Sequence, residues 1–190
     1  MSASEIHPIE ARQSDRSLLR AAVITGIGLG GLVDGIVFHQ ILQWHHMLSR
    51  AGYSPTTLIT SHNLEIDTYW DGIFHVGSLL CLVIGLGLLW RARAGASQAK
   101  TTLLNILAGF GLFNLVEGTI DHLLLGVHHV NEKVPNSEWL AWDSGFVIVS
   151  AAMMIPAIWI SVSQRRSTAS KSRATGNSGP NNKLKINSGG

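Results

Sequence analysis

Four stretches of the chain consist mainly of apolar residues, and polar segments separate them. They cover about residues 19–45, 70–90, 102–126 and 139–162. An α-helix of about 20 apolar residues is long enough to cross the hydrocarbon core of a bilayer. The pattern therefore predicts an all-α protein, a four-helix transmembrane bundle with short connections.

Both ends of the chain lack this apolar pattern. Residues 1–17 are polar without a helical period, and residues 163–190 are rich in Ser, Asn, Gly and Lys. Segments of this kind have too little apolar surface to form a packed core. We expect a flexible N-terminal tail at 1–17, a membrane domain at 18–162 and a disordered C-terminal tail at 163–190.

Part of the first apolar segment recurs in the third after a shift of 83 residues. Gly26 to His46 reads GIGLGGLVDGIVFHQILQWHH, and Gly109 to His129 reads GFGLFNLVEGTIDHLLLGVHH, with ten of the 21 positions identical. An acid, Asp34 or Glu117, and an H-x5-H-H pattern keep their register in both copies. A Trp-Asp pair opens both the second and the fourth segment. We therefore expect two parallel two-helix repeats.

Composition and charge support a membrane location. Hydrophobic residues make up 46% of the chain and charged residues 14%, whereas about 25% of residues are charged in soluble domains. The single cysteine, Cys81, excludes an intrachain disulfide and a cysteine-based metal cluster. We expect the lipid bilayer as a partner, a further membrane protein or a second copy of the chain as candidate partners, and no nucleic acid.

The distribution of Lys and Arg predicts the orientation. Twelve of the 14 lie in the two tails, at the start of the first segment (Arg20) or between the second and third segments, and only Arg50 and Lys133 lie on the other side. Loops rich in Lys and Arg remain in the cytoplasm. We expect a multi-pass inner (plasma) membrane protein whose N- and C-termini are cytoplasmic.

The histidines and acids then gather toward the outer leaflet. Residues seven apart on an α-helix share a face, and the first and third segments each carry two histidines at that spacing. Imidazole and carboxylate together form a ligand set for iron, zinc, manganese or copper as Cu(II). We therefore predict a metal site with His39, His46, His122 and His129 as core ligands and Asp71, His75 and Glu117 as further candidates.

Other interpretations of the same residues remain open. A metal-free protein that handles protons or ions would use acids within the membrane, and Asp34, Glu117 and Asp121 are the candidates. One b-type haem held by histidines of two facing helices is a further alternative, as is a structural subunit of a membrane complex. Taken alone, the pairs His45/His46 and His128/His129 are typical of water-exposed histidines near a membrane interface. Whether the protein is an enzyme stays open.

Three stretches of the sequence resemble a known family. They read LVDGIVFHQILQWHHM in the first segment, YWDGIFH at the start of the second, and LVEGTIDHLLLGVHHVNE in the third. They resemble a family of bacterial predicted membrane proteins with four spans and no assigned function, over about Leu18 to Val162. The resemblance implies a membrane location and a four-helix plan, and it implies no activity.

Overall fold

Every regular element in the described part of the chain is helical. The computed structural model describes residues 3–50, 61–92 and 98–176. The elements, in chain order, are α1 (Ala3–Val33), the π-helix η1 (Asp34–Ile41), α2 (Ser61–Ala92), α3 (Ala99–Glu117), the π-helix η3 (Gly118–Leu124), the 3-10 helix η4 (Asn136–Glu138) and α4 (Trp139–Gly176). The predicted all-α class is confirmed.

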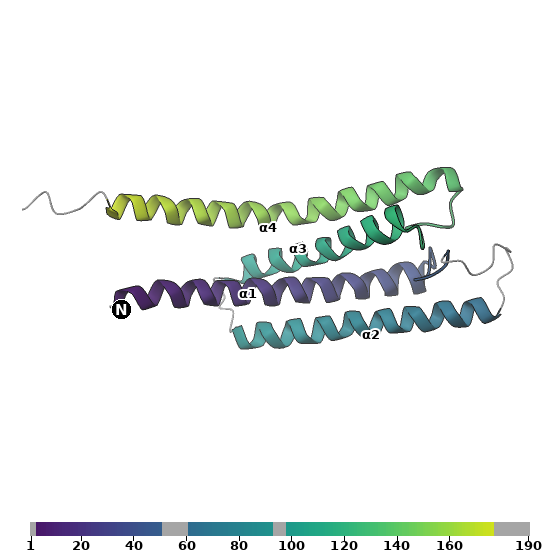
Figure 1. Cartoon of the computed structure of the whole chain (residues 1–190), viewed down its shortest axis with the longest axis horizontal. Helices are drawn as coiled ribbons and strands as arrows, with labels where there is room; N and C mark the ends of the chain where they lie inside the picture. Colours follow the sequence, from purple (N-terminus) through teal and green to yellow (C-terminus); the bar gives the residue numbers. More distant parts are fainter. Residues whose placement is uncertain (1–2, 51–60, 93–97, 177–190) are drawn as a thin grey trace, which may run out of the picture. The chain divides into compact units, whose positions relative to one another are not determined.

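Four helices are long and apolar enough to cross a membrane. These candidate spans are Ser14–Ile41, Leu64–Ala92, Ala99–Leu124 and Asn136–Ile160. They match the four apolar segments in number and order, so the predicted four-helix plan is confirmed. Helices α1 and α3 run in one direction, and α2 and the part of α4 before residue 158 run in the other (Figure 1).

The helices continue past the apolar segments. Helix α1 begins at Ala3 although we expected a flexible tail to residue 17, and α2 begins at Ser61 rather than near Trp70. Hydropathy marks only the part of a helix that suits lipid, whereas the backbone hydrogen bonds can continue through polar residues with good helix propensity. The exact ends of the helices were therefore not predictable from the apolar pattern.

The chain divides into two compact units, Met1–Ala157 and Ile158–Gly190. The first contains the histidines and the four spans up to Ala157. In the second, α4 continues to Gly176, where we expected a disordered tail from Ser163. Residues 177–190 lie outside the described residues.

Glycines allow the helices of the first unit to approach closely. A Cβ added at Gly26 of α1 would collide with the backbone of α3 at Ile106 and Gly109. In the same way, Gly28 faces the backbone of α2, and Gly111 faces Ser150 of α4. Small residues at such crossings allow the dispersion contacts that hold helices together in lipid. Helices α1 and α3 therefore form a central pair, with α2 packed on α1 and α4 packed on α3.

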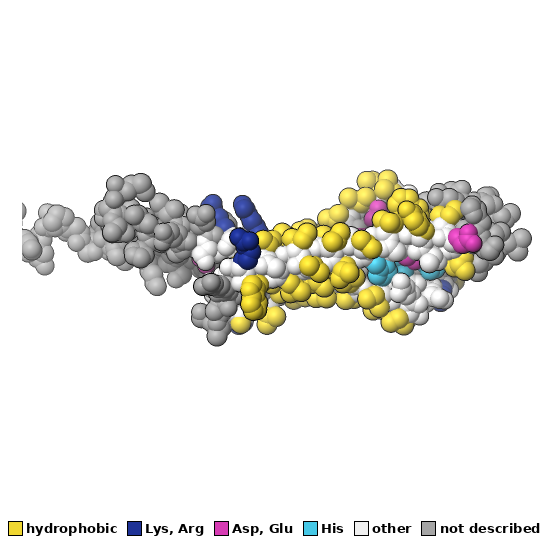
Figure 2. Space-filling view, turned by 90° about the horizontal axis from the view of Figure 1, so that it is seen from below, with side chains coloured by type: hydrophobic (Ala, Val, Ile, Leu, Met, Phe, Trp, Pro, Cys, Tyr) yellow, Lys and Arg dark blue, Asp and Glu magenta, His cyan; other side chains and the backbone are white. Residues whose placement is uncertain are grey.

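The inside of the first unit is small or polar, and its surface is apolar. The few buried apolar side chains are mainly alanines, whereas buried polar groups include Thr25, Ser78, Asn105, Asn114 and Ser150. Figure 2 shows a belt of apolar side chains with most of the visible Lys and Arg at one end and His and acidic side chains at the other. This distribution is the one expected of a protein surrounded by lipid.

Candidate metal centre

Both inner helices change from α to π geometry at a carboxylate. Helix α1 becomes η1 at Asp34, and α3 ends at Glu117, where η3 follows. In an α-helix, two residues five apart point about 140° away from each other. In η1 they meet, because Nε2 of His39 lies 3.1 Å from Oδ2 of Asp34. π-Helical turns are rare and occur often at functional sites.

Each π-helix ends in the same way. The last amides bond backward to carbonyls five and six residues earlier, Leu42 to Val37 and Trp44 to Phe38 in the first copy. The second copy makes the bonds of Leu125 to Ile120 and Val127 to Asp121. A residue with left-handed backbone follows in each copy, Gln43 with φ 49° and Gly126 with φ 59°. The histidine pair begins two residues after this residue in each copy.

One carboxylate on α2 and one on α4 accept hydrogen bonds from the histidines that follow α1 and α3. Asp71 of α2 accepts hydrogen bonds from Nδ1 of His39 at 2.9 Å, Nδ1 of His46 at 2.7 Å and the Met47 amide at 2.9 Å. Asp143 of α4 accepts bonds from Nδ1 of His129 at 2.7 Å and the Val130 amide at 2.9 Å. Carboxylates that accept from the distal nitrogen of a histidine orient it toward a metal.

His45 and His128 bond across the two copies. Nδ1 of His45 donates to the carbonyl of Val130 at 2.9 Å, and Nδ1 of His128 donates to the carbonyl of Met47 at 3.0 Å. A carbonyl oxygen can only accept, so Nδ1 carries the proton in both rings and Nε2 presents a lone pair. The tautomer that suits metal binding through Nε2 is thereby fixed in His45 and His128.

The free ligand atoms converge on one buried place. Nε2 of His39, His45, His122 and His128 and the carboxylate oxygens of Asp34 and Glu117 are buried without a hydrogen-bond partner. Their atoms form two overlapping groups, each with ligand atoms within 4.8 Å of one another: Asp34, His39, His45 and Glu117, and His45, Glu117, His122 and His128. We call these six residues the central cluster.

The rings of the central cluster are packed in a matching way in the two copies. The centroids of His39 and His45 are 4.6 Å apart at an interplanar angle of 70°, and those of His122 and His128 are 4.7 Å apart at 70°. These contacts agree with the repeat seen in the sequence. That two whole two-helix units repeat stays a prediction.

Burial and hydrogen bonding set the charge of the histidines that lie outside the spans. Burial disfavours the charged form, and it lowers the pKa of His45 to about 3 and that of His128 to about 4. The hydrogen bond to Asp71 raises the pKa of His46. At neutral pH the rings of His45 and His128 are therefore neutral, whereas His46 is biased toward the charged form.

The structure brings only some of the predicted ligands together. His39, His122 and Glu117 belong to the central cluster. His46 and His129 do not, and their Nδ1 atoms donate to Asp71 and Asp143. Nδ1 of His75 donates to the carbonyl of Asp71, and its buried Nε2 lies against Gly35. Of the proton-handling candidates, Asp34 and Glu117 are buried in the cluster, and Asp121 is half-buried outside it.

Three residues of the central cluster were not among the predicted metal ligands: Asp34, which was a proton-handling candidate, His45 and His128. His45 is 2% exposed and His128 0% exposed, so neither is the water-exposed residue that its position near the interface suggested. The available signal was the pattern itself, because both histidines of each adjacent pair keep their register in the two copies.

Comparison with known proteins adds a family. No curated protein and no solved structure matches the chain. A family model described as "Predicted membrane protein (DUF2243)" matches residues 21–164, which include all four apolar segments almost completely and every residue of the central cluster. The chain therefore belongs to this family of predicted membrane proteins.

Proposed function

We propose that this membrane protein binds transition-metal ions in the central cluster. The observation that carries the proposal is the convergence of four buried imidazole Nε2 atoms and two buried carboxylates, none with a hydrogen-bond partner. Buried polar atoms without partners are costly, and they are rare in folded proteins. Metal ions bound among them would provide these atoms with partners.

The contact between His39 and Asp34 supports a cation in particular. Nδ1 of His39 donates to Asp71, so a neutral ring would present a lone pair at Nε2 only 3.1 Å from a carboxylate oxygen of Asp34. Two acceptors repel each other at this distance unless a proton or a metal lies between them. One proton would satisfy this contact alone, and it would leave Nε2 of His45, His122 and His128 without a partner.

The charge of the site also favours a cation. Four buried carboxylates surround the histidines, those of Asp34, Asp71, Glu117 and Asp143. Among the described residues, the ion pairs of these carboxylates involve only histidine and neither Lys nor Arg. Uncompensated charge in a low-dielectric interior is very unfavourable, and divalent ions would neutralise it.

The two overlapping groups favour a pair of ions. An imidazole Nε2 can bind one ion, whereas the two oxygens of a carboxylate can bind one ion each. His45 and Glu117 are common to both groups, and Glu117 has both oxygens free. Glu117 would therefore bridge the two ions, and His45 would bind one of them. His39 and Asp34 would hold the first ion, and His122 and His128 the second. Two-metal sites of this kind have ions about 3.5–4 Å apart.

The ligands favour iron, manganese, zinc or Cu(II). Imidazole and carboxylate suit these ions, and the central cluster contains no sulfur ligand that would select Cu(I). A b-type haem fits the geometry less well. The rings of His45 and His128 stack with centroids 4.7 Å apart, and that of His122 lies 5.6 Å from that of His45. A porphyrin between the two halves would have to separate these rings.

Elemental analysis of the detergent-purified, untagged chain, together with its absorption spectrum, tests the proposal. We expect about two equivalents of metal per chain as isolated or after exposure to the divalent ions. The double variant Asp34→Asn with Glu117→Gln should lose the metal. The control is the double variant Glu65→Gln with Glu138→Gln, which removes the same number of charges from two exposed carboxylates. This control should keep the metal.

Three outcomes would contradict the proposal or its finer part. A chain that stays free of metal after exposure to the ions would favour proton or ion handling by Asp34 and Glu117. A sharp Soret band would favour the single haem. One equivalent of metal, lost in the double variant, would leave the metal centre in place and reject the pair of ions.

We also propose that the central cluster lies toward the outer leaflet of the plasma membrane, because 12 of the 14 Lys and Arg residues lie, in the sequence, near the two chain ends or between the second and third apolar segments. In a Cys81→Ser background, an impermeant maleimide should label Glu138→Cys in intact cells and should not label Lys100→Cys. Both positions are exposed in the structure. Labelling of Lys100→Cys and not of Glu138→Cys would show the orientation opposite to the proposed one.

A further inference from the structure

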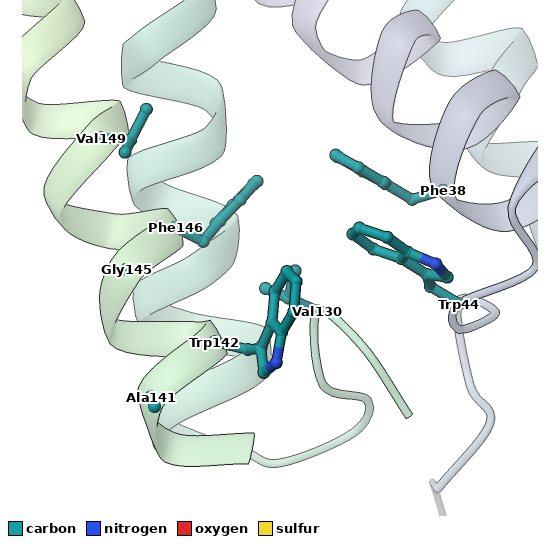
Figure 3. Close-up of a pocket in the computed structure, with 8 residues that line it drawn as sticks. All are labelled: Phe38, Trp44, Val130, Ala141, Trp142, Gly145, Phe146 and Val149. Atoms are coloured by element: carbon teal, nitrogen blue, oxygen red, sulfur yellow. The ribbon is translucent and has the colours of Figure 1, made fainter. Parts of the chain in front are cut away.

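A cavity of about 530 Å³ opens on the side of the first unit, between the end of the first span and α4. Its size lies within the range of small-molecule pockets. Figure 3 shows Phe38 and Trp44 on one side of it and Trp142 and Phe146 on the other, with Gly145 and Val149 on α4. We call it the aromatic pocket.

The four rings form a nearly continuous wall. Phe38 and Trp44 are stacked with centroids 5.3 Å apart, and Trp44 meets the edge of Trp142 at 5.3 Å. Phe38 and Phe146 close the wall in an edge-to-face contact at 6.3 Å. Contacts of these geometries are favourable for aromatic pairs, so the pocket has a defined shape.

One layer of aromatic rings separates the aromatic pocket from the central cluster. The ring of Phe146 lies 5.4 Å from that of His122, and the ring of Phe38 lies 6.3 Å from that of His45. The same rings thus line the pocket on one face and the histidines on the other. Whatever fills the pocket therefore keeps water from the lipid-facing side of the cluster.

The lining selects an apolar occupant. The pocket contains no charged residue, and a polar ligand would lose its hydrogen bonds to water without replacement. Its mouth joins the apolar surface, because Val149 is 55% exposed and Trp142 38% exposed. Phe38 and Val149 belong to spans that suit lipid. We propose that the aromatic pocket binds one acyl chain of a membrane lipid.

The corresponding positions of the second copy show that this lining is not general to the fold. The shift of 83 residues replaces Phe38 by Asp121 and Trp44 by Val127. Half of the aromatic wall is therefore missing there, and a carboxylate takes its place. The proposal depends on the membrane location of the chain and does not require a metal in the central cluster.

The test uses fluorescence of the detergent-purified full chain during titration with a long-chain fatty acid brominated in mid-chain, because bromine quenches nearby tryptophan. We expect saturable quenching by one equivalent, equally by the acid and by its methyl ester. Gly145→Leu should weaken binding at least tenfold, since a side chain there meets nothing within 4 Å and would extend into open space. Val149→Phe is a second filling variant, used if Gly145→Leu does not fold.

Gly77→Leu on α2 is the matched control, because that glycine also has open space around it. It should bind like the unchanged chain. Quenching that rises linearly without saturation, or that is equal in both filling variants and the control, would overturn the proposal. Quenching by the acid but not by the ester would show recognition of the headgroup and would overturn it too. The proposal would also be overturned if the chain formed a dimer and both filling variants dissociated it without changing the quenching. A second copy of the chain would then cover the pocket.

Discussion

The imidazole rings of His45 and His128 lie face to face, with centroids 4.7 Å apart and planes 2° apart. Each ring donates its Nδ1 proton to a backbone carbonyl of the other copy. The lone pairs of both Nε2 atoms thus reach the same buried place from opposite halves of the sequence. This arrangement makes the two rings central to the proposed site, although each lies next to a histidine with a different role.

Variants of the adjacent histidines should separate these roles. We expect His45→Ala and His128→Ala each to remove at least half of the bound metal, because each deletes a ligand atom. His46→Ala and His129→Ala should keep the metal and weaken its affinity by about 10–100-fold, as is typical when a group that supports the ligands is lost. Elemental analysis and metal titration of the four variants measure both effects.

The opposite order, with metal lost in His46→Ala and His129→Ala and kept in His45→Ala and His128→Ala, would contradict the central cluster. It would return the ligand set to the residues that the α-helical spacing predicts.

Asp71 should matter for both stability and metal affinity. It accepts three hydrogen bonds, from His39, His46 and the Met47 amide. In Asp71→Asn one carboxylate oxygen becomes an amide that cannot accept, and hydrogen bonds to charged groups contribute about 1.5–3 kcal/mol each. We expect a loss of about 2 kcal/mol in the free energy of unfolding of the metal-free chain, and a 10–100-fold weaker metal affinity.

Thermal unfolding in detergent and metal titration check the two parts separately. Glu65→Gln is the control on the same helix, since the side chain of Glu65 is exposed. Equal losses in the two variants would argue against a specific role for Asp71.

The spans could be predicted from the sequence, and the central cluster only in part. Twenty apolar residues in a row leave few alternatives to a membrane helix, so the number and order of the spans followed from hydropathy. The ligand set depended on a spacing of 3.6 residues per turn, which places His39 with His46. In the π-helix η1, Asp34 meets His39 instead. The change to π geometry depends on packing between helices, which a periodic pattern does not contain.

The left-handed residues that follow the π-helices could not be predicted from the sequence either. Nothing in the sequence around Gln43 indicates a left-handed residue, because glutamine rarely adopts positive φ. The only hint is that the corresponding position of the second copy is Gly126.

The comparison of Gln43 with Gly126 leads to a prediction about the two turns. Left-handed backbone costs a non-glycine residue roughly 1–2 kcal/mol. We expect Gln43→Gly to raise the free energy of unfolding by up to about 1 kcal/mol, partly offset by the greater freedom of the unfolded chain, and Gly126→Gln to lower it by about 1–2 kcal/mol. Unfolding of both variants in detergent measures the changes. A stabilising Gly126→Gln would mean that residue 126 is not left-handed in solution.

The crossing of α1 and α3 at Gly26 and Gly109 offers the sharpest test of the fold. A Cβ at Gly26 would meet the backbone of Ile106 and Gly109, and one at Gly109 would meet the backbone of Val23. Backbone cannot move aside as a side chain can, so we expect Gly26→Val and Gly109→Val each to cost about 3 kcal/mol or more, at the upper end of overpacking effects.

Gly87→Val controls for the change in helix propensity, because nothing lies within 4 Å of a Cβ at that glycine. It should cost less than about 1 kcal/mol. Gly26→Val and Gly109→Val both separate α1 from α3. In the double variant the second substitution therefore acts on a contact that the first has already weakened. The double variant should therefore lose less stability than the sum of the single losses, as expected for residues in contact. Strictly additive losses would mean that the two glycines do not face each other across one interface.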